Sequence, residues 1–324
     1  THDHKRGEDV RARLAVISEI PVAWEQAATG WLAMNASIRP EGLDPADVYL
    51  FCQMLVGAWP FGLSAEDAGG LSVLAERLVG WWTKALREAK LRSGWAAPDE
   101  AYEQAAADFA RAVLTPGRSG AFLGEVAAFV ERIAAPGALN ALVQMALRCT
   151  APGVPDCYQG TEYWDFSLVD PDNRRPVDFG TRRIALAQHL TLDLLSETWR
   201  DGRIKQALLR KLLALRQREP NVFAAGSWEP LAVAGTRASS ILAFLRRHED
   251  RAVLVVAART CAGGMVEGSG LVPEPGWWGD TRIEQPDAVA LQAVIGPEIE
   301  PGGRLDIASA LPVVPVGVWA LSLA

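Results

Sequence analysis

The spacing of apolar residues changes at Pro220, and this change constrains the fold more than any other feature of the sequence. Upstream, apolar side chains recur at the spacing of helices. Downstream, short runs rich in β-branched residues are separated by Gly and Pro, and the clearest are 241–245, 254–258 and 313–323. We therefore predict a mainly helical region over residues 5–219 and an all-β sandwich domain over residues 221–324.

Turn and capping residues divide the helical region. Asp44, directly before Pro45, stands where a helix N-cap is expected. Ser64-Ala65-Glu66-Asp67 is another cap candidate, and Pro98-Asp99 is expected to open a helix. Pro21 is expected to follow the end of the first helix, and Pro136 to end another. Six of the twelve tryptophans fall between residues 24 and 95, and their helical spacing favours a core role over sugar-stacking platforms.

The region between residues 138 and 218 carries a different signal. A helix over 138–149 is followed by a short apolar run, 154–158, which we interpret as the last strand of a parallel barrel; an ordinary buried strand is the alternative. About twenty residues without periodicity come next, a length typical of functional loops. Two further helices are expected near 181–198 and 203–218.

Amino-acid composition limits the classes of partner that the chain is expected to bind. Nearly half of the residues are hydrophobic (49%), which indicates a globular chain, and the formal charge is -7 with a pI near 5.3. A nucleic acid or an anionic membrane would favour a basic face, so we expect neither partner. The four cysteines have no metal-type spacing and are expected to be reduced in a cytoplasmic protein. No apolar run reaches the 18 residues of a membrane span.

Three segments carry candidate chemistry. The first segment, 1–9, contains His2-Asp3-His4, which could be part of a metal site, a frayed terminus or a loop at the end of a strand. In such a loop the Asp would stabilise positive charge on a substrate, and Lys5 and Arg6 would bind its hydroxyls. The second, 152–162, ends in Gly160-Thr161-Glu162 after the apolar run. The third, 170–178, is either a turn formed by its Pro, Asp and Asn residues or a polar cluster that binds sugar hydroxyls. The residues of that possible cluster are Asp172, Asn173, Arg174 and Arg175.

Together these segments resemble the maltooligosyltrehalose synthases of the α-amylase superfamily, glycoside hydrolase family 13. Thr1-His2-Asp3 resembles the superfamily motif after the seventh barrel strand, and Lys5 to Arg11 resembles the form found in the synthases, which usually have Thr where His4 stands. Residues 153–162 resemble the motif at the eighth strand, and 170–178 is the most specific match. Residues 84–103 resemble a helical insertion of the family, although Ser93-Gly94 and Asp99 depart from its usual residues. Residues 278–282 also resemble the family.

The resemblance implies a multidomain α/β fold: the carboxy-terminal part of a (β/α)8 TIM barrel with a large helical insertion, followed by the β-sandwich. The implied parts are the seventh strand and its helix (1–20), the insertion (21–137), the last strand with the active-site loop and final helices (138–220), and the sandwich (221–324). The nucleophile and general acid would precede residue 1, so the missing amino-terminal half of the barrel is an expected partner.

The implied activity is an isomerase reaction, (1->4)-α-D-glucan 1-α-D-glucosylmutase, with a retaining mechanism and no cofactor or metal. It converts the reducing-end α-1,4 bond of a maltooligosaccharide to an α,α-1,1 bond. Asp3 would stabilise the transition state. Substrate-binding roles would fall to His2, Lys5, Arg6, Glu162, Asp172, Asn173, Arg174 and Arg175. An α-glucan hydrolase of the same superfamily and a non-catalytic glucan-binding or assembly fragment are the alternatives.

Overall fold

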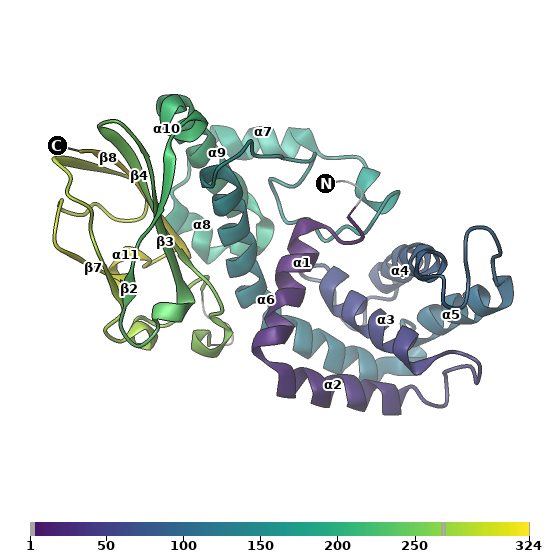
Figure 1. Ribbon diagram of the computed structural model, residues 1–324. Helices are drawn as coiled ribbons and strands as arrows, with labels where there is room; N and C mark the ends of the chain where they lie inside the picture. The colour runs from purple at the N-terminus through teal and green to yellow at the C-terminus, as the bar shows by residue number, and fades with distance from the viewer. Residues whose placement is uncertain (1–3, 267, 269, 324) are drawn as a thin grey trace. The chain divides into compact units, whose positions relative to one another are not determined.

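The computed structural model describes residues 4–266, 268 and 270–323. The chain forms two compact units, and each is assembled from separate stretches of sequence. Unit 1 consists of Thr1–Ala134 and Asp165–Pro176. Unit 2 consists of Ala135–Trp164 and Val177–Ala324. Figure 1 labels most of the helices and strands of both.

Unit 1 is helical. Its elements are α1 (Glu8–Ala15), η1 (Val16–Glu19), α2 (Pro21–Met34), α3 (Pro45–Ala58), α4 (Ala68–Ala89), α5 (Glu100–Val113), the first half of α6 (Pro116–Thr150) and the single turn η2 (Asp172–Arg174). Helix α3 contacts α1, α2 and α4, and α5 packs along α4. The predicted helical character of this region is confirmed.

Local capping chemistry fixes three of these helix starts. Asp44, Asp67 and Asp99 each accept a backbone hydrogen bond, from the N–H groups of Ala46 (2.8 Å), Gly70 (3.0 Å) and Tyr102 (3.0 Å). Each bond satisfies an N–H that the helix itself leaves without a partner. Pro21 follows the end of the first helix, as predicted, and it begins α2, because its missing N–H costs nothing at the first helical position.

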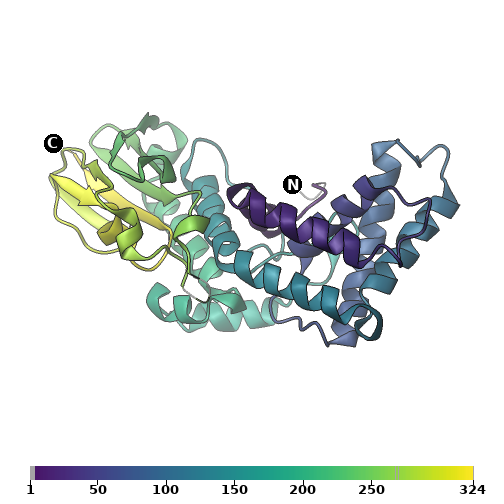
Figure 2. The ribbon, with the colours of Figure 1, turned by 90° about the horizontal axis from the view of Figure 1, so that it is seen from below.

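Aromatic side chains form much of the core of unit 1. Trp24 and Trp31 on α2 contact Phe129 on α6 with ring centroids 5.5 and 5.6 Å apart, and Figure 2 shows the two helices side by side. The core role predicted for the tryptophans is confirmed for five of the six, which are at most 4% exposed: Trp24, Trp31, Trp59, Trp81 and Trp82. Trp95 is the exception at 57% exposed.

Helix α6 continues through Pro136, so the prediction that Pro136 ends a helix was wrong. A proline inside a helix costs about 3 kcal/mol. Ile133, Leu139 and Leu142 around it are fully buried, and each contributes about 1.5–3 kcal/mol, so burial outweighs the broken hydrogen bond. By length and hydropathy α6 could cross a membrane, but 72% of its most apolar window is buried within the protein. Packing therefore accounts for its hydropathy.

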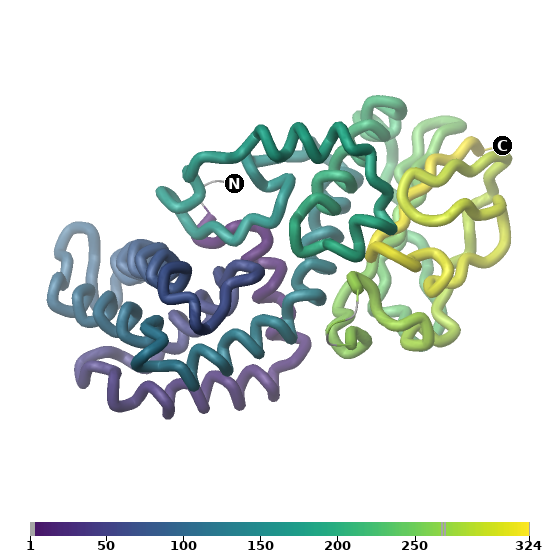
Figure 3. Tube along the Cα trace, turned by 180° about the vertical axis from the view of Figure 1, so that it is seen from behind, coloured from purple at the N-terminus to yellow at the C-terminus, as the bar shows by residue number. Residues whose placement is uncertain are grey.

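The run 154–158 forms no strand, which corrects the predicted barrel strand within the described chain. Val154 is 93% exposed, and no neighbouring strand pairs with this run anywhere in residues 4–266, 268 and 270–323. A parallel strand needs partners on the sheet and cover on both faces, which explains the absence. The segment between α6 and η2 is coil, and the tube in Figure 3 follows its course.

Unit 2 continues with helices of 3 to 16 residues and then turns to strands. The helices are α7 (Phe179–Ala187), α8 (Leu192–Glu197), η3 (Trp199–Asp201), α9 (Arg203–Arg218) and α10 (Pro220–Ala224). The helix predicted near 181–198 is therefore divided in two, with His189 in the left-handed region between the parts. The helix predicted over 203–218 is confirmed.

Two antiparallel sheets follow. The first has the order β1-β3-β4-β8-β6 and the second the order β2-β5-β7. Their strands are β1 (Ser227–Pro230), β2 (Val233–Ala234), β3 (Ile241–His248), β4 (Arg251–Ala258), β5 (Arg282–Glu284), β6 (Ala290–Ile295), β7 (Arg304–Asp306) and β8 (Val316–Ser322). The remaining elements are η4 (Ala238–Ser240), η5 (Ala262–Gly264), η6 (Pro275–Trp278) and α11 (Ile307–Ala310). The strand-rich character predicted after Pro220 is confirmed.

The centre of the larger sheet is apolar on both faces. Strand β4 lies between β3 and β8, and its residues Ala252 to Ala258 are all fully buried. A two-residue turn, Glu249-Asp250, joins β3 to β4, and Glu249 has a φ of 53°, as tight antiparallel hairpins require. The arrangement of the two sheets as a sandwich and the four domain boundaries stay predictions. The boundary between residues 137 and 138 falls inside α6.

Gly235 offers a test of close packing in unit 2. Its φ is 105°, and a Cβ added there would lie 2.5 Å from the carbonyl oxygen of Asp280. Gly302 also has a positive φ, 83°, but nothing lies within 4 Å of its added Cβ. We expect Gly302→Ala to cost about 1 kcal/mol of unfolding free energy. Gly235→Ala should cost at least about 2 kcal/mol, because backbone atoms block the new methyl group.

Urea unfolding of the two variants and the wild type measures this difference. Equal losses in both variants would show that the left-handed backbone alone accounts for the effect at Gly235, and that the clash with Asp280 is relieved without cost.

Candidate functional site

The first candidate segment meets residues 165–168, which directly precede the third segment, in unit 1. Arg6 forms an isolated antiparallel bridge with Leu168, and the N–H of Gly7 donates to the carbonyl of Ser167 at 2.8 Å. The carboxylate of Asp9, at the start of α1, accepts the N–H of Asp165. Figure 3 shows the same loop next to the beginning of the described chain. Segments about 160 positions apart in sequence are therefore held together by backbone contacts and by one bond from a backbone N–H to a side chain.

A glycine is needed at position 7 for this approach. A Cβ on Gly7 would lie 2.7 Å from the carbonyl oxygen of Ser167 and 3.0 Å from that of Asp165. Both are backbone atoms, so no side chain can move to make room. The glycine of the Lys5-Arg6-Gly7-Glu8 motif thus lets two stretches of backbone come into contact.

Asp172 is the central ion-pair partner of this loop. One carboxylate oxygen accepts from Nε of Arg77 at 2.9 Å, and the other from Nη2 of Arg77 at 3.0 Å and from the N–H of Leu168 at 2.7 Å. The same Arg77 Nη2 donates to the carbonyl of Phe166 at 2.6 Å. The Asp172 and Arg77 side chains are only 10% and 11% exposed. This is the bidentate geometry in which an arginine fixes a carboxylate most firmly.

The surroundings keep Asp172 ionised. Burial by itself raises the pKa of Asp172, but the hydrogen bonds and charge of Arg77 act against it, with help from Leu168 and Arg175. The net result is a pKa below the ordinary value of an aspartate. Asp172 was predicted to bind substrate; the structure gives this carboxylate a protein partner on both oxygens.

Arg13 holds the other side of the loop. Its Nη1 donates to the carbonyls of Val56, Gly57 and Trp59, and its guanidinium carbon lies 3.8 Å from the centroid of the Phe166 ring. Arg13 is 1% exposed, and burial lowers its pKa to about 9 against the opposing charges of Asp9 and Glu131. A buried cation packed on an aromatic face orders both partners.

One face of α4 serves as the platform for these contacts. Arg77, Lys84 and Glu88 are spaced by seven and four residues and so lie on one side of the helix. The Nζ of Lys84 reaches the carbonyl of Asp170 at 3.5 Å, and Glu88 pairs with Lys5 at 2.8 Å. Sequence reasoning missed Arg77 and Glu88. The polar stripe along a helix whose other side carries Leu71, Leu74, Leu78 and Trp82 was the signal for them.

Arg174 and Arg175, two further predicted residues of unit 1, lie at the surface of the same loop. Arg174 pairs with Asp170 at 2.6 Å, and Arg175 with Asp172 at 3.1 Å. Both arginine side chains are more than half exposed, so their guanidinium groups remain accessible to a ligand. Asn173 directly precedes these two arginines, lies in the turn η2 and is partly buried. Arg6 is half-buried, donates to the sulfur of Met54, and has a pKa lowered by burial.

Asp3, which is predicted to be catalytic, and His2, which is predicted to bind substrate, lie outside the described residues. The roles assigned to Lys5, Arg6 and residues 172–175 stay predictions, although the structure brings those residues together in one unit. No cluster of three or more His, Cys, Asp or Glu side chains suited to a metal exists within residues 4–266, 268 and 270–323.

Glu162, the remaining predicted residue, lies in unit 2. It pairs with Nε of Arg182 on α7 at 2.5 Å, and Arg182 also donates to the carbonyl of Gly160 at 3.2 Å. The pair borders a groove of about 780 Å³ between α7 and α9, whose walls include Phe179, Leu186 and Leu213. That volume suits a small-molecule ligand. Arg182 was not predicted, and its position four residues after the helix-capping Asp178 was the available signal.

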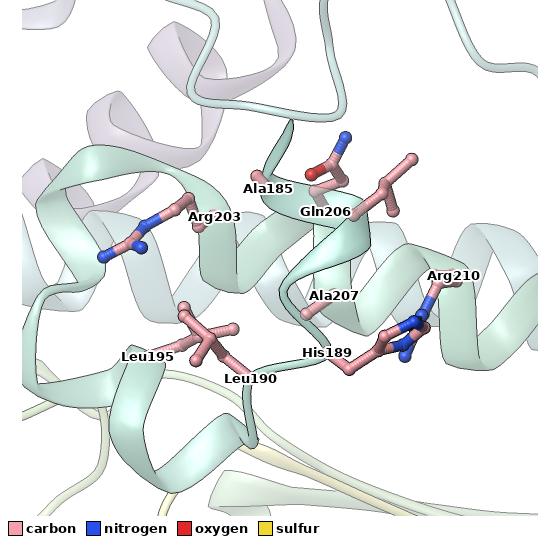
Figure 4. Close-up of a pocket in the computed structure, with 9 residues that line it drawn as sticks. Ala185, His189, Leu190, Leu195, Arg203, Gln206, Ala207 and Arg210 are labelled. Carbon is pink, nitrogen blue, oxygen red and sulfur yellow. Dashed lines mark hydrogen bonds between the residues drawn. The ribbon is translucent and has the colours of Figure 1, made fainter. Parts of the chain in front are cut away.

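A second cavity of unit 2 is too small for a sugar. Figure 4 shows it between α7, α8 and α9, with His189 beside Arg210. Nη1 of Arg210 lies 3.0 Å from Nδ1 of His189. The cavity holds about 20 Å³, which is room for a single water molecule. This cavity is therefore no substrate site.

Comparison with known proteins gives a consistent result. A putative maltooligosyl trehalose synthase of Mycobacterium tuberculosis is 37% identical over 263 residues, which are 80% of this chain and 30% of that protein. The maltooligosyltrehalose synthase structure from Arthrobacter ramosus matches 99% of this chain with a TM-score of 0.77 and 30% identity. A hypothetical maltooligosyl trehalose synthase of Sulfolobus tokodaii matches 98% of the chain with a TM-score of 0.68 and 27% identity.

The matches cover only part of each relative. This chain spans 30% of the length of the curated relatives and 38% of the chains in the two solved structures. No family model matches the sequence. The predicted resemblance to the maltooligosyltrehalose synthases is confirmed by the sequence and structure matches together.

Breaking the Asp172–Arg77 pair should be costly and pH-dependent. We expect Asp172→Asn to lower the unfolding free energy at pH 7 by about 3 kcal/mol, because it leaves a buried guanidinium without its counter-charge. The folded pKa of Asp172 lies below its unfolded value of about 4. The contribution of the carboxylate is therefore complete above about pH 4 and is lost as the pH falls through the folded pKa.

Urea unfolding of wild type and variant at several pH values measures the difference. Asp170→Asn is the matched control, since Asp170 pairs with the exposed Arg174, and its loss should stay below about 1 kcal/mol. A penalty for Asp172→Asn that stays constant down to pH 3 would show that the ionised pair is not its source.

Proposed function

Because this chain is homologous to the maltooligosyltrehalose synthases, we propose that it takes part in intramolecular transglucosylation as the carboxy-terminal part of such an enzyme. The observation that carries the proposal is the match to the Arthrobacter ramosus synthase over 99% of the chain. The substrate would be a maltooligosaccharide, and the product would carry an α,α-1,1 bond at its reducing end.

The reaction needs two carboxyl groups in a retaining arrangement. A carboxylate attacks the anomeric carbon of the penultimate glucose while an acid protonates the leaving O4 of the terminal glucose. The terminal glucose then turns over, its anomeric hydroxyl attacks the covalent intermediate, and its proton returns to the same carboxyl group. No water is consumed. In our proposal both groups come from the amino-terminal half of the barrel, and Asp3 stabilises the charge of the transition state.

The contacts of Lys5 support a positioning role for this residue. Its ammonium group pairs with Glu88 at 2.8 Å, while 41% of the side chain is exposed. A lysine held by one carboxylate and still accessible can donate further hydrogen bonds to a sugar hydroxyl, since an ammonium group has three donors. In our proposal these donors retain the released glucose in the site, where water must be excluded if hydrolysis is to be avoided.

The contacts of Asp172 suggest a modified role for the third segment. Its carboxylate orders the loop through Arg77, and the exposed guanidinium groups of Arg174 and Arg175 are then free to meet sugar hydroxyls. In the proposed enzyme Asp172 acts on the substrate through the loop it orders. We further propose that residues 1–20 and 138–220 complete a (β/α)8 barrel once the amino-terminal half supplies neighbouring strands for residues 154–158, and that the two sheets of unit 2 form a sandwich.

Replacing Lys5 should change the ratio between hydrolysis and trehalose formation. In the complete enzyme, we expect Lys5→Ala to raise the ratio of hydrolysis to trehalose formation about tenfold or more, because a positioning contact is lost while the bond-breaking groups remain. Product analysis by chromatography, with maltopentaose as substrate, measures this ratio.

Lys5→Arg keeps the charge and the ion pair with Glu88, so this matched variant should stay closer to the wild type. A solvated lysine at the start of a helix predicts no change in either variant. An unchanged product ratio for Lys5→Ala would therefore remove Lys5 from the proposed site.

The chain of residues 1–324 alone should make no trehalose linkage from maltopentaose. A retaining mechanism needs a nucleophile and an acid, and sequence motifs for neither were recognised in this chain. Adding the amino-terminal half of the enzyme should restore turnover if the two parts bind. Turnover by residues 1–324 alone, at a rate near that of the complete enzyme, would mean that the catalytic pair lies within these residues and that the role given to Asp3 is wrong.

A further inference from the structure

Trp95 differs from the other tryptophans of unit 1 in its exposure. It is 57% exposed, whereas the five others between residues 24 and 95 are at most 4% exposed. Trp95 lies in the irregular segment between α4 and α5. Tryptophan carries a large apolar ring system, and a ring that stays in water gives up most of the free energy that its burial would contribute.

A cation whose position is fixed, Arg87, packs against the Trp95 ring. The guanidinium carbon of Arg87 lies 5.0 Å from the centroid of the Trp95 ring. Arg87 in turn forms a bidentate pair with Glu103 on α5, at 2.8 and 2.7 Å, and the Glu103 side chain is 8% exposed. A guanidinium held at both nitrogens keeps its plane, so the aromatic ring above it has a firm base.

The segment that carries the ring is also fixed. The hydroxyl of Ser93 donates to Glu103 and accepts the N–H of Asp99 at 3.1 Å, while Asp99 caps α5. Lys90 ends α4 in the left-handed conformation. The backbone on both sides of Trp95 is thus attached to α4 and α5, and little conformational entropy would be lost when a ligand meets the ring.

The cation at the ring, Arg87, and the nearby Arg92 of the same segment both have carboxylate partners within the protein. Arg87 pairs with Glu103, and Arg92 pairs with Asp44 and Asp47. This environment favours a neutral ligand that has a flat apolar face. A pyranose ring fits that description, because its faces present C–H groups and its hydroxyls lie around the edge.

Helix α4 connects this ring to the candidate site. Glu88, the neighbour of Arg87 on α4, forms the ion pair with Lys5. We propose that Trp95 is a stacking platform for a glucose unit of the maltooligosaccharide chain. The proposal rests on the proposed function for the identity of the ligand, and it adds a subsite that binds without taking part in bond cleavage.

Kinetics of the complete enzyme test this subsite. We expect Trp95→Ala to raise the KM for maltoheptaose about tenfold and to leave kcat within about twofold of the wild type, because a contacting tryptophan is typically a dominant binding residue. Trp95→Phe keeps an aromatic face and should recover most of the loss. Trp228→Ala removes another exposed tryptophan, 44% exposed on β1, and serves as the matched control with an unchanged KM.

Calorimetric titration with β-cyclodextrin separates binding from turnover, since this ring of α-1,4-linked glucose has no reducing end to rearrange. Weaker binding by Trp95→Ala than by the wild type and Trp228→Ala supports the platform. That result together with a wild type that forms no trehalose would reject the proposed function and leave the platform in place. If the wild type is active but Trp95→Ala changes neither the KM nor the affinity for cyclodextrin, the platform alone is overturned. A loss of cyclodextrin affinity in Trp228→Ala equal to that in Trp95→Ala would also overturn it.

Discussion

The bidentate pair between Asp172 and Arg77 determines where the candidate loop can lie. Both side chains are almost buried, so an unmatched charge on either one would be expensive. Arg77 also binds the carbonyl of Phe166, and Asp172 binds the N–H of Leu168, so the pair fixes the backbone on either side of it. The bridge at Arg6, the approach at Gly7 and the contact of Arg13 with Phe166 all need the loop in that position.

The same pair shows how far sequence reasoning could go. The segment 170–178 could be recognised as distinctive. The helix starts at Asp44 and Asp99 could be predicted because a capping carboxylate and the N–H group that donates to it lie within a few residues. The partner of Asp172 lies 95 positions away, and nothing local selects Arg77 over other arginines. Asp172 was therefore predicted as a ligand to sugar, when its environment makes it first an organiser of the loop.

Burial explains the two elements that local sequence propensity predicted wrongly. Pro136 should have ended a helix by its local effect, but the apolar residues around it are fully buried, and α6 continues. The run 154–158 has the composition of a strand, yet a strand exists only with partners, and the described chain supplies none. For the tryptophans the helical spacing was a sufficient guide except at Trp95, which stands in an irregular segment where periodicity carries no information.

The discontinuous assembly of unit 1 has a consequence for synthesis of the protein. Arg77 leaves the ribosome 95 residues before Asp172. At 5–20 residues per second, the interval is roughly 5–20 s. Helices α1 to α5 can form and pack during this time, since their caps and aromatic contacts are all available. Arg77 would meanwhile be solvated by water, and the loop that carries the candidate site would be the last part of unit 1 to find its place.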